Sequence, residues 1–117
     1  MLNYSASVDQ VFHALAHPTR VTIVEGLSRG PASVSELAEP LSISMPAVIQ
    51  HLQVLEASGL VRSKKRGRVR ICNIEPTALR TAERWITQRR TSWERRLDRL
   101  GEYLAEHPDG PDPRRKG

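Results

Sequence analysis

The residues of this sequence best suited to chemistry are five cations in one short segment. Lys64, Lys65, Arg66, Arg68 and Arg70 lie within seven residues, and no acidic residue interrupts them. Such a cluster suits phosphate binding, because each cation that reaches a polyanion releases condensed counterions. A solvated surface hairpin is the alternative explanation for the same charges.

A second stretch, residues 44–58, presents a polar but uncharged face. Ser44 is expected to cap a helix whose first turn tolerates Pro46, while Val48 and Leu52 belong to its buried stripe. The opposite face can approach bases without repelling phosphates, since no acidic residue occurs in its first three turns. The residues predicted to contact nucleic acid are Ser44, Met45, Pro46, Ile49, Gln50 and Gln53 on the helix and Lys64, Lys65, Arg66 and Arg68 in the cationic segment.

A pair of helices joined by a tight turn would position this uncharged face. Ser33 and Glu36 match the Ser-x-x-Glu capping box, which predicts a first helix over residues 34–41. Gly59 suits the left-handed end of the second helix, and Leu60 supplies the apolar contact that follows it. The two stretches are therefore expected to form one unit.

The cationic segment is expected at the tip of a β-hairpin. Two β-rich runs over residues 62–73 flank a turn at Arg66-Gly67. Before the helix pair, Ser7 begins a capping-box pattern that predicts a helix near residues 8–16, and Pro18 opens another.

The pattern from residue 76 to residue 106 predicts a long amphipathic helix. Thirty residues span roughly 45 Å, which is longer than so small a core can cover. Part of its apolar stripe therefore needs another surface, and a second copy of the chain would provide one. The apolar residues predicted to form this interface are Leu79, Trp85, Ile86, Trp93 and Leu97.

Composition favours one basic domain, residues 1–106, followed by a disordered basic tail, residues 107–117. The chain has 117 residues, a formal net charge of +5 and a pI near 10.1, which favour a polyanion partner. No apolar run approaches the length of about 20 residues that crosses a membrane, and no signal pattern opens the chain. We expect a cytoplasmic protein without a membrane partner. A single cysteine, Cys72, excludes an internal disulfide and fits a reducing compartment.

The assembled motifs resemble the ArsR/SmtB-like family of bacterial winged helix-turn-helix repressors. The resemblance covers about residues 8–106 and is carried by ALAHPTRVTIVEGL, SVSELAEPLSISMPAVIQHLQVLEASGLV and RGRVRICNIEP. It implies a mainly α fold with a small β-hairpin: a winged helix-turn-helix with long N- and C-terminal dimerisation helices. The second helix of the pair would lie in the major groove of double-stranded DNA, with the hairpin as the wing. Because the first helix would join the dimer interface, Phe12 is predicted to belong to it.

The same resemblance argues against a metal site or another cofactor. Metal-sensing members of the family carry a Cys-x-Cys pair where this chain has Ser33 and Ser35, and serine is a poor ligand for soft metals. A second family site needs histidine with carboxylates across the last helices, and only a weak candidate set is present: Asp98, Glu102, Glu106 and His107.

No enzyme motif is present, and the isolated reactive side chains have structural explanations. The sequence lacks a phosphate-binding glycine loop, a nucleophile elbow and a paired-carboxylate motif. His51 is expected to pack against or bond a neighbouring helix. Cys72 is expected to fill space in a strand, with a redox switch between subunits as the alternative.

Two functions remain after these exclusions. The favoured one is a homodimeric, metal-independent transcriptional repressor that binds a near-palindromic DNA site. The alternative is a protein-interaction module that uses the winged-helix fold and its long last helix to hold a partner. The five clustered cations favour DNA, because a module that binds only protein would have no need of them.

Overall fold

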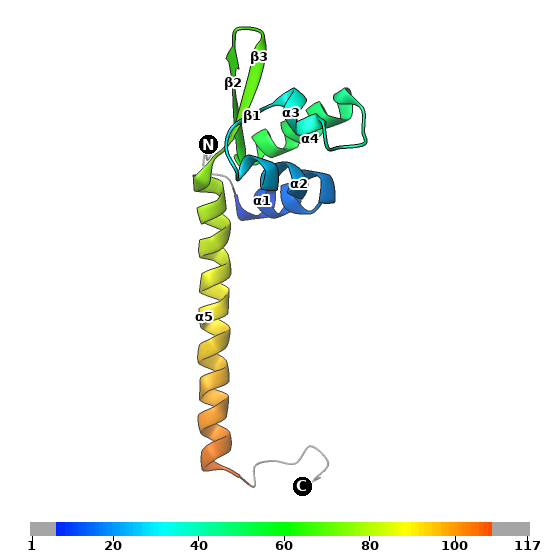
Figure 1. The fold of residues 1–117 in the computed structure, drawn as a ribbon. Helices are drawn as coiled ribbons and strands as arrows, with labels where there is room; N and C mark the ends of the chain where they lie inside the picture. Colours follow the sequence, from blue (N-terminus) through cyan, green and yellow to red (C-terminus); the bar gives the residue numbers. More distant parts are fainter. Residues whose placement is uncertain (1–6, 109–117) are drawn as a thin grey trace. The chain divides into compact units, whose positions relative to one another are not determined.

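The computed structural model describes residues 7–108 and is mainly helical with a small antiparallel sheet (Figure 1). The helices are α1 (Val8–Leu15), α2 (Pro18–Leu27), α3 (Val34–Ala38), α4 (Met45–Ala57) and α5 (Pro76–Glu106), and the strands are β1 (Ala32–Ser33), β2 (Val61–Arg66) and β3 (Val69–Ile74). This order confirms the predicted fold class. Of the two terminal helices that were expected to be long, only α5 is so, because α1 has eight residues.

The sheet contains one strand that the sequence did not predict. Its strand order is β1-β3-β2, so the short strand β1 pairs antiparallel with β3 and adds a third strand to the expected hairpin. Ala32 lies opposite Cys72 in this pairing. Two residues are too few to show the alternation that identifies a strand in a sequence.

Local hydrogen bonds explain where α3 and its neighbours begin. The hydroxyl of Ser33 accepts a bond from the backbone N–H of Glu36, and the backbone N–H of Ser33 donates to the Glu36 carboxylate, which completes the predicted capping box. Helix α3 is shorter than expected and ends at Ala38. The expected cap at Ser7 is not formed: Ser7 occupies the N-cap position of α1, but its side chain accepts no hydrogen bond from the helix. Pro18 opens α2, as predicted.

One hydrophobic core contains residues from each of the helices α1, α2, α3 and α4, from the sheet and from the first turns of α5. Val11 from α1, Ile23 from α2, Leu55 from α4 and Val61 from β2 are almost completely buried. Ala78 and Ala82 extend the core into α5. This core holds α3, α4 and the sheet in fixed positions relative to one another.

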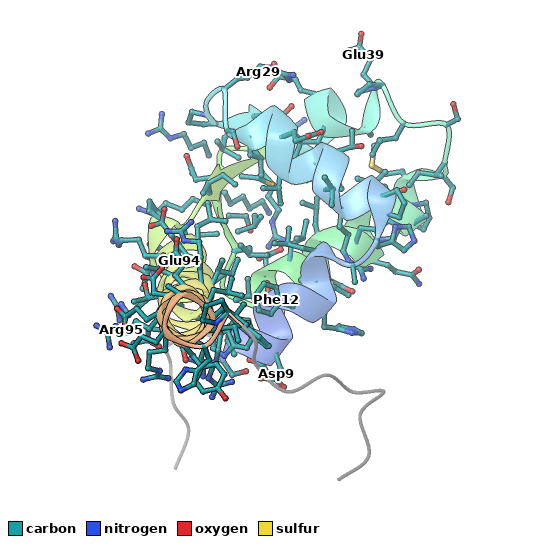
Figure 2. All side chains as sticks on the ribbon, turned by 90° about the horizontal axis from the view of Figure 1, so that it is seen from below. Asp9, Phe12, Arg29, Glu39, Glu94 and Arg95 are labelled. Atoms are coloured by element: carbon teal, nitrogen blue, oxygen red, sulfur yellow. The ribbon has the colours of Figure 1, made fainter. Side chains whose placement is uncertain are left out.

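The chain divides after Arg84 into two units, and the second one contains the remainder of α5. Its large apolar side chains are exposed: Trp93 retains 60% of its accessible surface and Leu97 retains 58%. Figure 2 views α5 along its axis, with Glu94 and Arg95 projecting from it. No described helix is long and apolar enough to cross a membrane. Most of the predicted tail lies outside the described residues.

Candidate nucleic-acid interface

Both ends of α4 are closed by specific hydrogen bonds. The hydroxyl of Ser44 accepts a bond from the backbone N–H of Ala47 at 3.3 Å, and Pro46 occupies the first turn. At the other end, Gly59 has φ +82° and donates to the carbonyl of Glu56, while Leu60 donates to the carbonyl of Leu55. These two bonds form a Schellman motif, with Leu60 fully buried behind it. The helix therefore has a defined length and direction.

The outer face of α4 has the uncharged character that the sequence predicts. Met45 and Ile49 keep about 40% of their surface accessible, and Gln50 and Gln53 are exposed beside them. The buried side chains Val48, Leu52 and Leu55 lie on the inner face. The amino-terminal end of the helix, where the macrodipole is positive, carries no acidic side chain.

The turn of the β2–β3 hairpin contains Gly67 and Arg68, one residue later than predicted. Arg66 pairs with Val69 as the last residues of the two strands, which leaves a two-residue turn. Gly67 adopts φ +62°, a conformation typical of the first central residue of a type II′ turn. Arg68 therefore occupies the tip of the hairpin.

The strand register separates the cations onto both faces of the hairpin. Lys64 pairs with Ile71 and shares one face with Arg66, whereas Lys65 pairs with Arg70 on the other face. Like charges directly opposite each other weaken a strand pair, so Lys65 and Arg70 reduce the stability of the isolated sheet. The cationic surface thus surrounds the tip, and all five side chains are exposed.

Arg62 differs from these five cations because it forms an ion pair, in which its side chain is the more exposed partner. It donates to the Glu75 carboxylate at 3.2 Å, near the base of the hairpin. Hydrogen bonds from Thr77 come first among the causes that lower the pKa of Glu75, and Arg62 contributes further. Arg62 therefore has an anionic partner within the protein, whereas none of the five tip cations forms an ion pair among the described residues.

A groove of ≈ 300 Å³ joins the hairpin to the outer face of α4. Ile49 and Gln53 line it from the helix, and Arg68 and Arg70 line it from the hairpin. A second hollow of ≈ 420 Å³ is lined by Lys64 and Arg66 with β1 residues. The first groove places two cations beside Ile49 and Gln53, and it is also lined by Glu56, whose carboxylate accepts a hydrogen bond from Ser63. Cations next to uncharged side chains suit a ligand with both bases and phosphates.

Every predicted nucleic-acid residue is exposed, and the structure adds Arg70 to the set. The sequence placed Arg70 in the cationic cluster, but only the strand register shows that it faces the groove with Arg68. Phe12, predicted for a dimer interface, is half-buried and packs against the core (Figure 2). The predicted α5 interface residues are exposed to different degrees: Leu79, Trp85, Ile86, Trp93 and Leu97.

The structural explanations expected for His51 and Cys72 agree with the contacts. Nδ1 of His51 lies 3.3 Å from Nη1 of Arg20 on α2, so His51 bonds a neighbouring helix as predicted. Cys72 is fully buried in β3, and burial raises the pKa of its thiol. Both effects make this thiol a poor nucleophile. Among the described residues, no three His, Cys, Asp or Glu side chains gather in a group that would hold a metal ion.

Comparisons with known proteins place the same segments in a family of regulators. Residues 15–64 match a helix-turn-helix domain model. The HTH-type transcriptional regulator Rv2034 of Mycobacterium tuberculosis is 42% identical over 100 residues, which cover 82% of this chain and 94% of that protein. The transcriptional repressor SdpR of Bacillus subtilis is 27% identical over 79 residues, covering 68% of this chain and 88% of that protein.

A solved structure gives the same result for the fold. The ArsR-like transcriptional regulator from Rhodococcus sp. RHA1 is 34% identical and superposes with a TM-score of 0.73, covering 82% of this chain and 91% of that one. The resemblance inferred from the HPTR, helix-pair and hairpin motifs is thereby confirmed. With its capped helix pair, cationic hairpin and these relatives, the chain belongs to the ArsR/SmtB-like family of winged helix-turn-helix transcriptional regulators.

Proposed function

We propose that this protein is a homodimeric, sequence-specific DNA-binding repressor. The observation that carries the proposal is the groove in which Ile49 and Gln53 of α4 lie beside Arg68 and Arg70 of the hairpin. Among the described residues, neither arginine forms an ion pair. An uncharged helix face can read base edges, while cations beside it hold the phosphates. SdpR, a relative with a similar sequence, is named a transcriptional repressor, which supports the direction of control.

Helix α4 would read bases in the major groove. Gln50 is exposed, and its amide can both accept and donate a hydrogen bond, as recognition of adenine requires. Ile49 beside it offers an apolar contact for a thymine methyl group. Ser44, Met45, Pro46 and Gln53 complete the exposed face and would contact bases or the sugar-phosphate backbone.

The hairpin would enter the minor groove as a wing. Cations on both of its faces and at its tip match a groove that has a phosphate strand on each side, whereas contact with one strand would need cations on one face only. The minor groove is about 6 Å wide in standard DNA, and narrow segments attract arginine most strongly. Arg68 at the tip is the residue best placed to enter it.

Dimerisation would follow from the exposed stripe on α5. Leu79, Ile86, Trp93 and Leu97 repeat at helical spacing, and each keeps more than a third of its surface accessible. A contiguous exposed apolar stripe of this kind marks an interaction surface. A two-fold pair of such helices buries the stripe of each copy with the same residues. Two copies of α4 would then meet half-sites about 34 Å apart on a near-palindromic operator.

Metal ions would not control this binding, and the protein would act in the cytoplasm where the DNA is. The hydroxyl of Ser33 and the carboxylate of Glu36 already cap α3, and Ser35 supplies only another hydroxyl. Addition of Zn(II), Cd(II), As(III) or Ni(II) is therefore expected to leave operator affinity unchanged. Release of the operator by a stoichiometric amount of one of these metals would contradict this part of the proposal.

Footprinting on the DNA upstream of the protein's own gene tests the proposal. We expect protection of two half-sites separated by about one helical turn, and lower expression of a reporter placed behind that DNA. A protein that protects no segment, but captures a protein partner through α5, would instead be the interaction module that the sequence leaves as the alternative. Activation of the reporter would contradict the repressor assignment alone.

A further inference from the structure

The guanidinium of Arg20 makes three contacts that join α1 to the recognition helix. Its Nε donates to the carbonyl of Ala14 at 2.6 Å, and its Nη2 donates to the carbonyl of His13 at 3.3 Å. Both carbonyls lie in the last turn of α1, where i→i+4 partners run out, and the carbonyl of His13 also accepts a bond from the backbone N–H of Ala16. The remaining nitrogen, Nη1, lies 3.3 Å from Nδ1 of His51 on α4. One side chain of α2 therefore fixes α4 to the end of α1.

The contact with His51 requires one protonation state of that imidazole. An arginine side chain has donors but no acceptor, so Nδ1 of His51 must be the acceptor and its proton must sit on Nε2. The ring of His17 lies 4.6 Å from the ring of His51, and the Nδ1 of His17 accepts a bond from the backbone N–H of Thr19. A protonated His51 would lose its bond from Arg20 and would face a cation instead.

Among the described residues, the charges that act on His51 include no anion that would compensate for a positive charge. They are those of His17, the N-cap residue of α2, and of Arg20 on α2. On α4 itself the nearest acidic residue is Glu56, five positions away. Burial first, and then the charges of His17 and Arg20, lower the pKa of His51 below its ordinary value of 6.5. The neutral form is therefore the one that the fold holds.

We propose that Arg20 is a positioning residue for the recognition helix, and that operator binding requires the unprotonated, Nδ1-accepting form of His51. His51 directly follows Gln50, so the angle at which α4 presents its base-reading face depends on this bond. A base contact tolerates little misalignment, whereas phosphate contacts by the hairpin tolerate more. Loss of the bond should thus reduce operator affinity more than affinity for random DNA. The inference depends on the proposed DNA-binding function.

The direction of the pH effect follows from the state that binds. Operator affinity should be complete above about pH 6.5 and should decline as the pH falls through the lowered pKa of His51, because the bound state then excludes a proton. Acidification makes the net charge of a protein more positive, which would strengthen contact with phosphates. A decline on acidification is therefore opposite to what net charge alone predicts.

Fluorescence anisotropy with operator and scrambled duplexes at about pH 8 and about pH 5.5 tests the inference. The variants are Arg20→Ala, His51→Asn and, as a control, Arg29→Ala, which removes an exposed arginine beyond the end of α2 (Figure 2). Asparagine keeps an acceptor near the position of Nδ1 but does not titrate. We expect wild type to lose operator affinity at the lower pH by a factor of less than about ten, because the pKa of His51 lies below 6.5. His51→Asn should lose none, and Arg20→Ala should lose about tenfold at pH 8 on the operator only. Arg29→Ala should follow wild type.

Each result separates the inference from the function on which it depends. If wild type prefers its operator but His51→Asn keeps the wild-type pH profile, the role of His51 is wrong while the function stands. If wild type binds operator and scrambled duplex equally at about pH 8, the proposed sequence-specific function is wrong. Nitrogen-15 chemical shifts of His51 in the free protein then test the bond from Arg20 by itself. If the proton of neutral His51 sits on Nε2 in wild type and is shared between both ring nitrogens in Arg20→Ala, the bond from Arg20 sets the tautomer, as inferred. A proton on Nδ1 in wild type overturns the inference.

Discussion

At the scale of single residues, Gln50 is the side chain whose role is most specific to sequence. It is exposed on α4, and its amide can form two hydrogen bonds with adenine. We expect Gln50→Ala to cost about 1–3 kcal/mol of binding free energy on the operator and little on random DNA. Anisotropy titrations with the two duplexes measure this difference. Equal losses on both would show that Gln50 contacts the backbone or acts only through the fold.

Arg66 tests the other kind of contact, because it lies at the end of β2 beside the hairpin tip. Arg66→Ala should weaken binding to operator and random DNA alike, and should make the log–log salt dependence shallower by about one unit. Arg62→Gln is the matched control, since Arg62 belongs to the same strand but pairs with Glu75. If the two variants have the same salt slope, the division of the hairpin into an ion-paired base and a cationic tip is incorrect.

At the scale of elements, two glycines, one at the carboxyl end of α4 and one within α5, give stability predictions of opposite sign. Gly59 has φ +82° in the Schellman motif, so Gly59→Ala should destabilise the fold by about 1 kcal/mol. Gly101 lies within α5, and an added Cβ would meet no atom within 4 Å. Gly101→Ala should increase helix content, because alanine favours a helix interior by roughly 0.5–1 kcal/mol. Urea unfolding and circular dichroism measure the two effects.

The sequence predicts these elements well where one strong local signal is present. The capping box at Ser33, the helix start at Ser44 and the left-handed end at Gly59 each depend on residues close in the chain, and the structure contains all three. The signal at Ser7 was equally local but is not used. A capping pattern shows that a bond can form, whereas the surrounding structure determines whether it does.

Features that depend on distant residues were less accessible. Strand β1 exists because Ala32 and Ser33 reach β3, about forty positions later in the chain. Lys65 lies directly opposite Arg70 only because the turn falls at Gly67 and Arg68, whereas the predicted turn at Arg66 and Gly67 would have placed Ser63 opposite Arg70. The three-way contact of Arg20 joins helices that no periodicity relates to one another. These features of the candidate site could be identified only from the structure.

At the scale of the whole molecule, the exposed stripe on α5 makes the oligomeric state the main expectation. Leu97→Glu should dissociate the dimer, because it would place a carboxylate in the middle of the apolar interface. Gln88→Glu is the matched control: it adds the same charge to the opposite face of α5, nine residues away. Sedimentation at micromolar concentration should show a dimer for wild type and the control. A wild-type monomer, or a dimeric Leu97→Glu variant, would contradict the predicted interface.

The measurement that tests sequence-specific DNA binding most directly compares two duplexes over a range of salt. One contains the footprinted upstream site, and the other contains the same bases in scrambled order. We expect the dimer to bind the first at least about 1,000-fold more tightly, with both affinities falling steeply as salt increases because the wing contacts phosphates in each complex. Equal affinity for the two duplexes at every salt concentration would contradict the account, since α4 would then read no bases.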